Sequence, residues 1–239
     1  MPCILAIETS AHIGAVALLR GQRCEQVLAV ESVRDEQKLS AWVLPAIERV
    51  IADAGLTHAA IDAIAFSAGP GSFTGVRTAC ATAQSLAYAW QRPLVTVDSL
   101  EALAEVSTAA NICVVLDARM REVFSASFAR QADGELTRLT PTTVSAPDAV
   151  VLPANSDSIG SGVNLLPAPQ NVSLAATAHA EAQWAHGVAR VAARKLARGE
   201  TTEPMHAEPI YVRNSVALTE AERTKARWAD LHPAREAVV

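Results

Sequence analysis

The stretch C-I-L-A-I-E (residues 3–8) is a short apolar run that ends on an acidic residue, and it predicts a buried β-strand. The stretch I-C-V-V-L-D (residues 112–117) repeats this pattern in the second half of the chain. Each run is followed by further predicted elements in the order strand, strand, helix, strand, helix. Two such copies predict a two-lobed α/β protein whose mixed sheets are flanked by helices. They also place Glu8 and Asp117 at corresponding ends of the first strand of each copy.

Hydrophobic periodicity and turn residues give the expected boundaries of the elements. In the first half we expect strands at residues 3–8, 15–20, 25–31, 61–66 and 94–97 and helices at 35–54, 73–90 and 99–107, the last capped by Ser99. In the second half we expect strands at 112–117, 122–130, 135–139 and 158–160, a short helix at 146–151 and a long helix at 180–198. The expected organisation is an N-terminal lobe (1–108), a smaller C-terminal lobe (109–214) and a tail (215–239) that is either helical or frayed.

The composition of the 239-residue chain excludes several classes of protein. The formal net charge is −5 and the pI is about 5.7, whereas a protein that binds nucleic acid unaided usually has a basic face. The four cysteines are far apart and form no C-x-x-C pair, which argues against a disulfide framework and a thiolate zinc site. The N-terminus lacks the basic region of a signal peptide, and no uncharged run is apolar enough to span a membrane. We therefore expect a cytoplasmic protein that contacts nucleic acid only through a partner.

A glycine-rich loop, S-A-G-P-G-S-F-T-G-V-R (residues 67–77), lies between a predicted buried strand and a predicted helix. One interpretation is that its backbone N–H groups bind an anion at the helix N-terminus, with Ser72 as N-cap and Arg77 nearby. The other is a tight turn in which the glycines permit close packing. The loop lacks both the G-K-[ST] of a Walker A loop and the third glycine of a dinucleotide fingerprint, which favours the second interpretation.

The helix that follows this loop carries an apolar stripe with small residues around it. Such a stripe either packs in the core or receives a partner helix, and the sequence leaves both interpretations open. Its members are Phe73, Val76, Cys80, Ala83, Ala87 and Trp90.

Two predicted hairpin turns, Glu8-Thr9-Ser10 and residues 117–122, stand where a two-lobed fold of this kind clamps phosphates. The second turn has Arg119, Met120 and Arg121 where small residues would be needed, so the sequence predicts at most a degenerate nucleotide cleft. An ion pair between Arg119 and Glu122 is the plainer interpretation of that turn. The six histidines form neither H-E-x-x-H nor H-x-x-x-H, and no metal site is predicted. The candidate residues of the degenerate cleft are Glu8, Thr9, Ser10, Asp117, Gly160 and Gly162.

Four stretches together resemble the bacterial TsaB family. They are I-L-A-I-E-T-S near the N-terminus, G-P-G-S-F-T-G-V-R in the loop, D-A-R-M-R-E-V-F from Asp117 and H-A-E-P-I-Y-V-R-N from His206. The resemblance spans residues 3–214, and the loop is its most specific part. This family of threonylcarbamoyladenosine biosynthesis proteins belongs to the actin-like ATPase superfamily. The resemblance therefore implies a two-lobed actin-like fold, that is, a duplicated ribonuclease H-like fold.

The resemblance also implies a function without catalysis by this chain alone. Members act as platform subunits for N6-threonylcarbamoyladenosine formation at adenosine 37 of tRNAs that read codons beginning with A. In that system the sister protein TsaD carries the chemistry and an H-x-x-x-H metal motif, and the ATPase TsaE joins the pair. The implied partners are thus TsaD as a heterodimer, TsaE, a second copy when the chain is alone, and tRNA through the complex, with no membrane. The complex uses ATP, and this chain holds no cofactor firmly.

The resemblance places the partner interface on the two long helices of the N-terminal lobe. Two positions depart from the family pattern: Leu39 stands where members commonly have His, and Glu8 where many have Asp. An apolar residue at position 39 still suits a helix interface, whereas a polar contact of that His is not carried over. The interface candidates are Leu39, Trp42, Val43, Ile47, Phe73, Val76, Arg77 and Cys80.

Two alternatives belong to other functional classes. One is a small ATPase or kinase of the same superfamily that acts on its own, using Glu8, Asp117 and the turn at Gly160–Gly162. The other is a peptidase, which the sequence disfavours because it shows neither a metal motif nor a Ser-His-Asp pattern at sensible positions.

Overall fold

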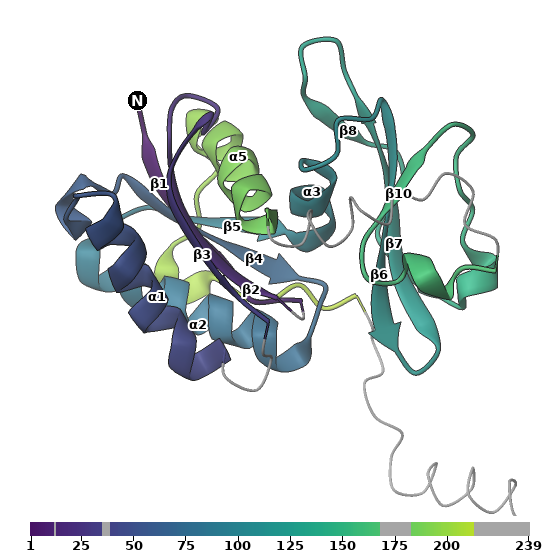
Figure 1. Ribbon diagram of the computed structural model, residues 1–239, viewed down its shortest axis with the longest axis horizontal. Helices are drawn as coiled ribbons and strands as arrows, with labels where there is room; N and C mark the ends of the chain where they lie inside the picture. Colours follow the sequence, from purple (N-terminus) through teal and green to yellow (C-terminus); the bar gives the residue numbers. More distant parts are fainter. Residues whose placement is uncertain (12, 35–38, 168–182, 213–239) are drawn as a thin grey trace, which may run out of the picture.

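The first of two mixed β-sheets is built around the strand formed by residues 3–8. The computed structural model describes residues 1–11, 13–34, 39–167 and 183–212. The first sheet has the order β3-β2-β1-β4-β5, in which β1, β2 and β3 are antiparallel and β4 and β5 run parallel to β1 (Figure 1). These strands are β1 (Cys3–Glu8), β2 (Gly14–Arg20), β3 (Gln26–Val33), β4 (Ala63–Gly69) and β5 (Leu94–Asp98).

The second sheet repeats the centre of the first. Its order is β10-β6-β7-β8, with β6 antiparallel to β7 and parallel to β10, and β9 pairs with β7. The strands are β6 (Asn111–Arg119), β7 (Glu122–Arg130), β8 (Leu136–Arg138), β9 (Thr143–Ser145) and β10 (Asp157–Ile159). Glu8 pairs with Ala15 across the first hairpin, and Asp117 pairs with Val123 across the second. The predicted pair of mixed sheets flanked by helices is confirmed.

Helices cover both faces of the first sheet because its central strands are apolar on both faces. Leu5 and Ile7 of β1 pack with α1 (Leu39–Asp53) and α2 (Phe73–Trp90). Ile4 and Ala6 point the other way and pack with α3 (Ser99–Ala104) and α5 (Trp184–Ala197). Figure 1 shows α5 on the side of the sheet opposite α1 and α2. Although α5 comes from the second half of the chain, it packs on the first sheet. None of the helices in the described ranges is long and apolar enough to cross a membrane.

Short elements of the second half differ from their predicted form. The helix expected at 146–151 is a single 3₁₀ turn, Pro147–Ala149. The two nearby prolines and the weak hydrophobic periodicity of this stretch do not support a longer helix. The strand expected at 135–139 is reduced to β8, and β9 follows it without having been predicted. Further 3₁₀ turns are His58–Ala60, Val163–Leu165 and Pro204–His206. The predicted tail at 215–239 lies outside the described residues, as do residues 35–38 and 180–182 of two predicted helices.

The cap of α3 is Asp98 rather than the predicted Ser99. Asp98 Oδ1 accepts hydrogen bonds from the backbone N–H groups of Leu100 (2.9 Å) and Glu101 (3.0 Å). A carboxylate that accepts two N–H groups at a helix N-terminus also meets the positive end of the helix dipole. This frees the Ser99 hydroxyl for the buried cluster described below.

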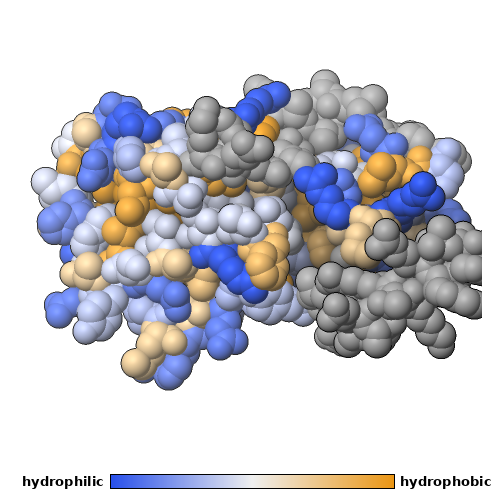
Figure 2. All heavy atoms as spheres, turned by 90° about the horizontal axis from the view of Figure 1, so that it is seen from below, coloured by the Kyte–Doolittle hydropathy of each residue, from blue (hydrophilic) through white to orange (hydrophobic). Residues whose placement is uncertain are grey.

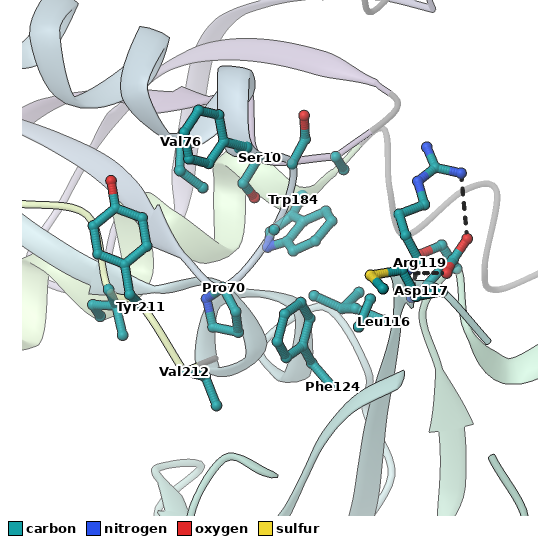
Figure 3. A pocket seen from close by; sticks show the side chains of 18 residues that line it. Ser10, Pro70, Val76, Leu116, Asp117, Arg119, Phe124, Trp184, Tyr211 and Val212 are labelled. Atoms are coloured by element: carbon teal, nitrogen blue, oxygen red, sulfur yellow. Dashed lines mark hydrogen bonds and ion pairs between the residues drawn. The ribbon is translucent and has the colours of Figure 1, made fainter. Parts of the chain in front are cut away.

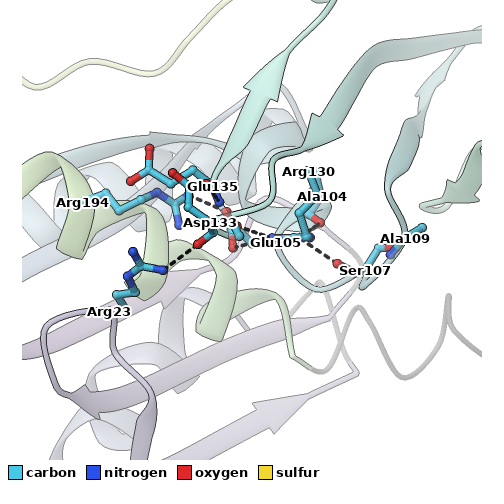
Figure 4. A network of polar contacts seen from close by, with 10 residues as sticks. Arg23, Ala104, Glu105, Ser107, Ala109, Arg130, Asp133, Glu135 and Arg194 are labelled. Carbon is cyan, nitrogen blue, oxygen red and sulfur yellow. Dashed lines mark hydrogen bonds and ion pairs between the residues drawn. The ribbon is translucent and has the colours of Figure 1, made fainter.

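A buried ionic network joins the two sheets behind α3 (Figure 4). Glu105, almost fully buried, contacts Arg194 of α5 at 2.5 Å and Arg130 of β7 at 3.8 Å. Arg130 Nη2 also donates to the carbonyl oxygens of Ala104 (3.3 Å) and Ser107 (2.7 Å). One carboxylate therefore joins a helix that packs on the first sheet to a strand of the second sheet.

Replacing this carboxylate is expected to destabilise the protein. Glu105→Gln leaves two largely buried guanidinium groups without their counter-charge and lowers the free energy of unfolding by about 3–5 kcal/mol. The matched control is Glu200→Gln, which breaks the exposed pair with Arg198 (2.6 Å) and changes stability little. Urea denaturation of both variants measures the difference, and equal midpoints would show that the network does not stabilise the contact between the lobes.

Candidate functional site

The turn after β1 packs tightly against the N-terminus of α2. The Ser72 backbone N–H donates to the carbonyl oxygen of Ser10 (2.7 Å), and Thr9 Oγ1 donates to the carbonyl oxygen of Gly75 (2.7 Å). A Cβ atom on Gly71 or Gly75 would overlap the carbonyl oxygen of Ser10 or Thr9. The loop glycines thus permit one backbone to approach another, which supports the tight-turn interpretation of the loop. Ser72 is the N-cap of α2, as the sequence predicts.

Glu8 lies beneath this turn and is fully buried. Its Oε1 accepts hydrogen bonds from the Ser10 backbone N–H and from Ser10 Oγ (2.5 Å), while Oε2 has no hydrogen-bond partner among the described residues. The hydroxyls of Ser10, Ser67 and Ser99 form a cluster beside it, with Ser67 and Ser99 2.6 Å apart. Burial raises the pKa of the Glu8 carboxyl to about 7, although hydrogen bonds from Ser10 and Ser67 oppose the shift.

Asp117 occupies the corresponding place in the second lobe but has different surroundings. Its Oδ1 accepts from the Arg119 backbone N–H (2.7 Å), and its Oδ2 lies 3.4 Å from Arg119 Nη1. Arg119, Met120 and Arg121 all have positive φ angles (62°, 55° and 60°), a backbone region in which non-glycine residues are uncommon. The second turn is therefore made of three long side chains in left-handed conformation, and its carboxylate forms an ion pair with Arg119.

The turn at Gly160–Gly162 packs on the backbone of β6. The Gly162 N–H donates to the carbonyl oxygen of Val115 (2.9 Å), and the Asp117 N–H donates to Ser161 Oγ (3.2 Å). A Cβ atom on Gly160 would overlap that same Val115 carbonyl oxygen. Close packing thus accounts for both glycines, and a role in holding a nucleotide stays a prediction.

A cavity of about 470 Å³ lies between the two hairpins (Figure 3). Of the six residues predicted for a degenerate nucleotide cleft, Ser10 and Asp117 line it, and the other four do not. No three His, Cys, Asp or Glu side chains within the described ranges are placed to hold a metal ion. The cavity wall also includes four aromatic residues that the sequence did not bring together: Phe73, Phe124, Trp184 and Tyr211.

The residues predicted for a partner interface divide into two groups. Five of them are buried in the protein's own core: Leu39, Val43, Ile47, Val76 and Cys80. Their selection needs correction, because the apolar stripe of each helix faces the first sheet and is not available to a partner. Trp42 is half-buried, and its Nε1 donates to Glu31 Oε1 (3.0 Å). Phe73, which is 58% exposed, and Arg77 do face outward.

The outward face of α2 carries a second line of residues, in which the sequence analysis selected Phe73 and Arg77 but missed Ala81, Ser85 and Tyr88. Their spacing of three or four residues places them on one side of the helix. We call this line the α2 stripe; it consists of Phe73, Arg77, Ala81, Ser85 and Tyr88, all exposed.

Known proteins resemble the chain over most of its length. A family model described as TsaD, tRNA N6-adenosine threonylcarbamoyltransferase, matches residues 34–198. The solved structure of YeaZ from Pseudomonas aeruginosa is 32% identical, with a TM-score of 0.75, over 88% of this chain and all of that one. The chain belongs to the TsaB/YeaZ family, which is related to TsaD.

Two proteins named as tRNA threonylcarbamoyladenosine biosynthesis protein TsaB agree with this assignment. The Escherichia coli protein is 29% identical over 225 residues, which cover 90% of this chain and 96% of that protein. The Haemophilus influenzae protein is 35% identical over 133 residues, about half of each chain. The chain is thus a TsaB homologue involved in threonylcarbamoyladenosine biosynthesis on tRNA.

Glu8 is expected to make stability depend on pH. Its pKa is higher in the folded state (about 7) than its ordinary value of 4.5, so the folded protein binds more protons between these values. The free energy of unfolding therefore falls as pH rises from about 5 to 8, by on the order of 3 kcal/mol from this group.

Glu8→Gln removes the titration and keeps an acceptor for the Ser10 N–H group. The free energy of unfolding of the variant therefore rises relative to that of the wild type as pH rises. Urea midpoints at pH 5, 6, 7 and 8 measure this difference. The exposed Glu48→Gln serves as control and keeps the wild-type profile. A difference between wild type and Glu8→Gln that is constant with pH would contradict a neutral buried carboxyl.

Proposed function

We propose that this protein is a non-catalytic subunit for N6-threonylcarbamoyladenosine formation at adenosine 37 of tRNA. In this proposal the protein binds TsaD through the exposed face of α1 and α2 and holds TsaD in its active arrangement. Membership of the TsaB/YeaZ family supports the pathway. The α2 stripe is the observation that carries the docking mechanism, because it is a continuous exposed face of a helix.

The α2 stripe has small residues at its centre and large ones at its ends. Ala81 and Ser85 leave a shallow middle, and the Ser85 hydroxyl is turned back onto the Ala81 carbonyl oxygen (2.8 Å). Two helices approach to 8–10 Å when the residues at their crossing point are small. Phe73 and Tyr88, at 58% and 80% exposure, then contact the partner on either side of the crossing. A helix of the partner therefore fits this surface better than a flat partner surface does.

Other exposed groups extend the proposed surface. The Arg77 guanidinium lies 3.2 Å from the centre of the Phe73 ring, which keeps both side chains in a defined position. On the neighbouring α1, Leu44 is half-exposed. Figure 2, seen from the side on which α1 and α2 lie in Figure 1, shows apolar atoms in small groups between polar ones. Such a mixed surface suits a subunit that is stable alone and binds a partner reversibly.

The geometry of the cleft supports a non-catalytic role. Catalysis of phosphate chemistry in this fold would need carboxylates and backbone N–H groups that face the space between the hairpins. Here Glu8 is buried behind the first turn, Asp117 is paired with Arg119, and the Ser72 N–H is bonded to Ser10. We infer that TsaD supplies the chemistry and TsaE the ATPase, that tRNA is contacted through the complex, and that a second copy uses the same surface when the chain is alone.

The alternative of a free-standing ATPase or kinase rests on Asp117, which does border the cavity. Calorimetry of the isolated protein with ATP and magnesium separates the two proposals. Micromolar binding with turnover would favour the enzyme, whereas activity that appears only after TsaD is added favours the platform.

The docking surface is tested by charge placed on exposed positions. Ala81→Asp and Tyr88→Asp are expected to weaken binding to the TsaD of the same organism at least tenfold and to lower tRNA modification in a reconstituted system in parallel. Titration calorimetry measures the dissociation constant. Thermal unfolding is expected to change by no more than a few degrees, because neither side chain packs in the core.

The matched control is Val151→Asp, which changes an equally exposed apolar residue (85%) in the second lobe. It is expected to leave both binding and tRNA modification unchanged. Full affinity in Ala81→Asp and Tyr88→Asp would eliminate the α2 stripe as the interface. A loss in all three variants would point to a general effect of added negative charge.

A further inference from the structure

We propose that the cavity between the two hairpins is a binding site for a small, uncharged aromatic ligand. This site shares Phe73 with the α2 stripe and is otherwise formed by other residues, and the proposal does not depend on the docking function. It rests on the shape of the cavity, on the residues that form its wall and on the state of the polar groups that border it.

The size and position of the cavity fit a small ligand. Its volume of about 470 Å³ lies within the usual range of ligand sites, and its wall comes from both sheets. The first lobe contributes the turn after β1 and the start of α2, and the second contributes the end of β6 and Phe124 of β7. Residues from both lobes would therefore contact an occupant, as Figure 3 shows.

The wall is rich in aromatic side chains although the chain is poor in them. The whole sequence has four Phe, four Trp and two Tyr, and four of these line the cavity. In Figure 3, Trp184, Phe124 and Tyr211 lie around Pro70, and Leu116 lies beside Phe124. Trp184 and Phe124 are nearly buried, so their rings are held by packing before any ligand arrives. Aromatic walls of this kind favour a planar ring by stacked or edge-to-face contacts.

Three polar side chains at the cavity, those of Trp184, Ser10 and Ser161, form hydrogen bonds within the protein. The Trp184 Nε1 donates to the carbonyl oxygen of Ser99 (2.9 Å), so the indole needs nothing from a ligand. Ser10 Oγ donates to Glu8, and Ser161 Oγ accepts from the Asp117 N–H.

The charged groups at the cavity are likewise paired. Asp117 and Arg119 compensate each other to one side of the cavity (Figure 3). A charged ligand would lose its hydration and find no unpaired counter-charge among these groups, whereas an uncharged ring loses little on leaving water.

The test uses fluorobenzene as probe and ¹⁹F NMR on the full-length protein. Wild type is expected to bind it saturably with a dissociation constant on the order of 1 mM or lower, the range for a fragment of this size. A 4-fluorophenyl phosphate probe, which adds charge to the same ring, is expected to bind at least tenfold more weakly. Tighter binding of the phosphate would overturn the uncharged ligand class.

Two variants place the binding in the cavity. Leu116→Trp fills it from β6 and is expected to abolish saturable binding. Leu139→Trp makes the same change at a half-exposed position outside the cavity wall and is expected to bind like wild type. Thermal unfolding shows whether each variant folds. If Leu116→Trp does not fold, Ser161→Phe, which fills the cavity from the neighbouring Gly160–Gly162 turn, replaces it.

Loss of binding in the folded, filled variant together with retention in Leu139→Trp establishes the site. Absence of saturable binding to wild type, or equal binding to the filled variant, overturns it. Neither result bears on the docking proposal, because the α2-stripe variants are judged by affinity for TsaD.

Discussion

The close contact between the turn after β1 and the N-terminus of α2 is the constraint on which the rest of the site depends. Two backbone segments touch there, and they do so only because positions 71 and 75 are glycine. Hydrogen bonds from Ser72 to Ser10 and from Thr9 to Gly75 fix the contact. The contact sets the direction of α2, closes one wall of the cavity and seals Glu8 beneath the turn. A loop that resembles an anion-binding loop in sequence is thus occupied by the protein's own backbone.

This constraint makes the two duplicated halves chemically unequal. Glu8 and Asp117 occupy equivalent strand positions, but Glu8 is buried among serine hydroxyls whereas Asp117 borders the cavity and pairs with an arginine. Burial raises the pKa of Glu8 and favours its neutral form, whereas Asp117 lies 3.4 Å from the Arg119 guanidinium. The two carboxylates therefore lie in different environments and on different sides of the first turn. In a nucleotide-binding protein of this fold, both could be directed at one ligand.

The order of the main strands and helices could be read from the sequence because it follows from periodicity. The alternation of Ile4 and Ala6 with Leu5 and Ile7 toward two helical layers is a local property of one apolar strand. Short elements were less predictable, since β9 and the turn Pro147–Ala149 depend on pairing with β7 and on nearby prolines. The packing of α5 on the first sheet is set by tertiary contacts, and no local sequence pattern predicts it.

The site was harder to predict than the fold, for two physical reasons. Apolar periodicity identifies the buried stripe of a helix, so it selected Val43 and Val76. On the outward α2 stripe the sequence analysis selected Phe73 and Arg77, whereas Ala81, Ser85 and Tyr88 are marked only by their exposure. The cavity, in turn, takes its aromatic wall from four segments that are far apart in sequence. The loop, β7, the start of α5 and the chain near Tyr211 meet only after both sheets have formed. Glycine spacing gave the loop its correct structural interpretation but not the partner against which it packs.

Phe73 connects the two surfaces that the fold creates. Its ring stands at the N-terminal end of the α2 stripe, stacks against Arg77 and also forms part of the cavity wall. An occupant of the cavity and a partner on α2 would therefore share a side chain. If the occupant changes the position of that ring, it changes the affinity of the partner, and reciprocity requires the partner to change the affinity of the occupant by the same factor. This coupling is limited to the side chains of Phe73 and Arg77. The backbone of residues 71–75 does not take part, because it has no room to move toward the Thr9–Ser10 turn.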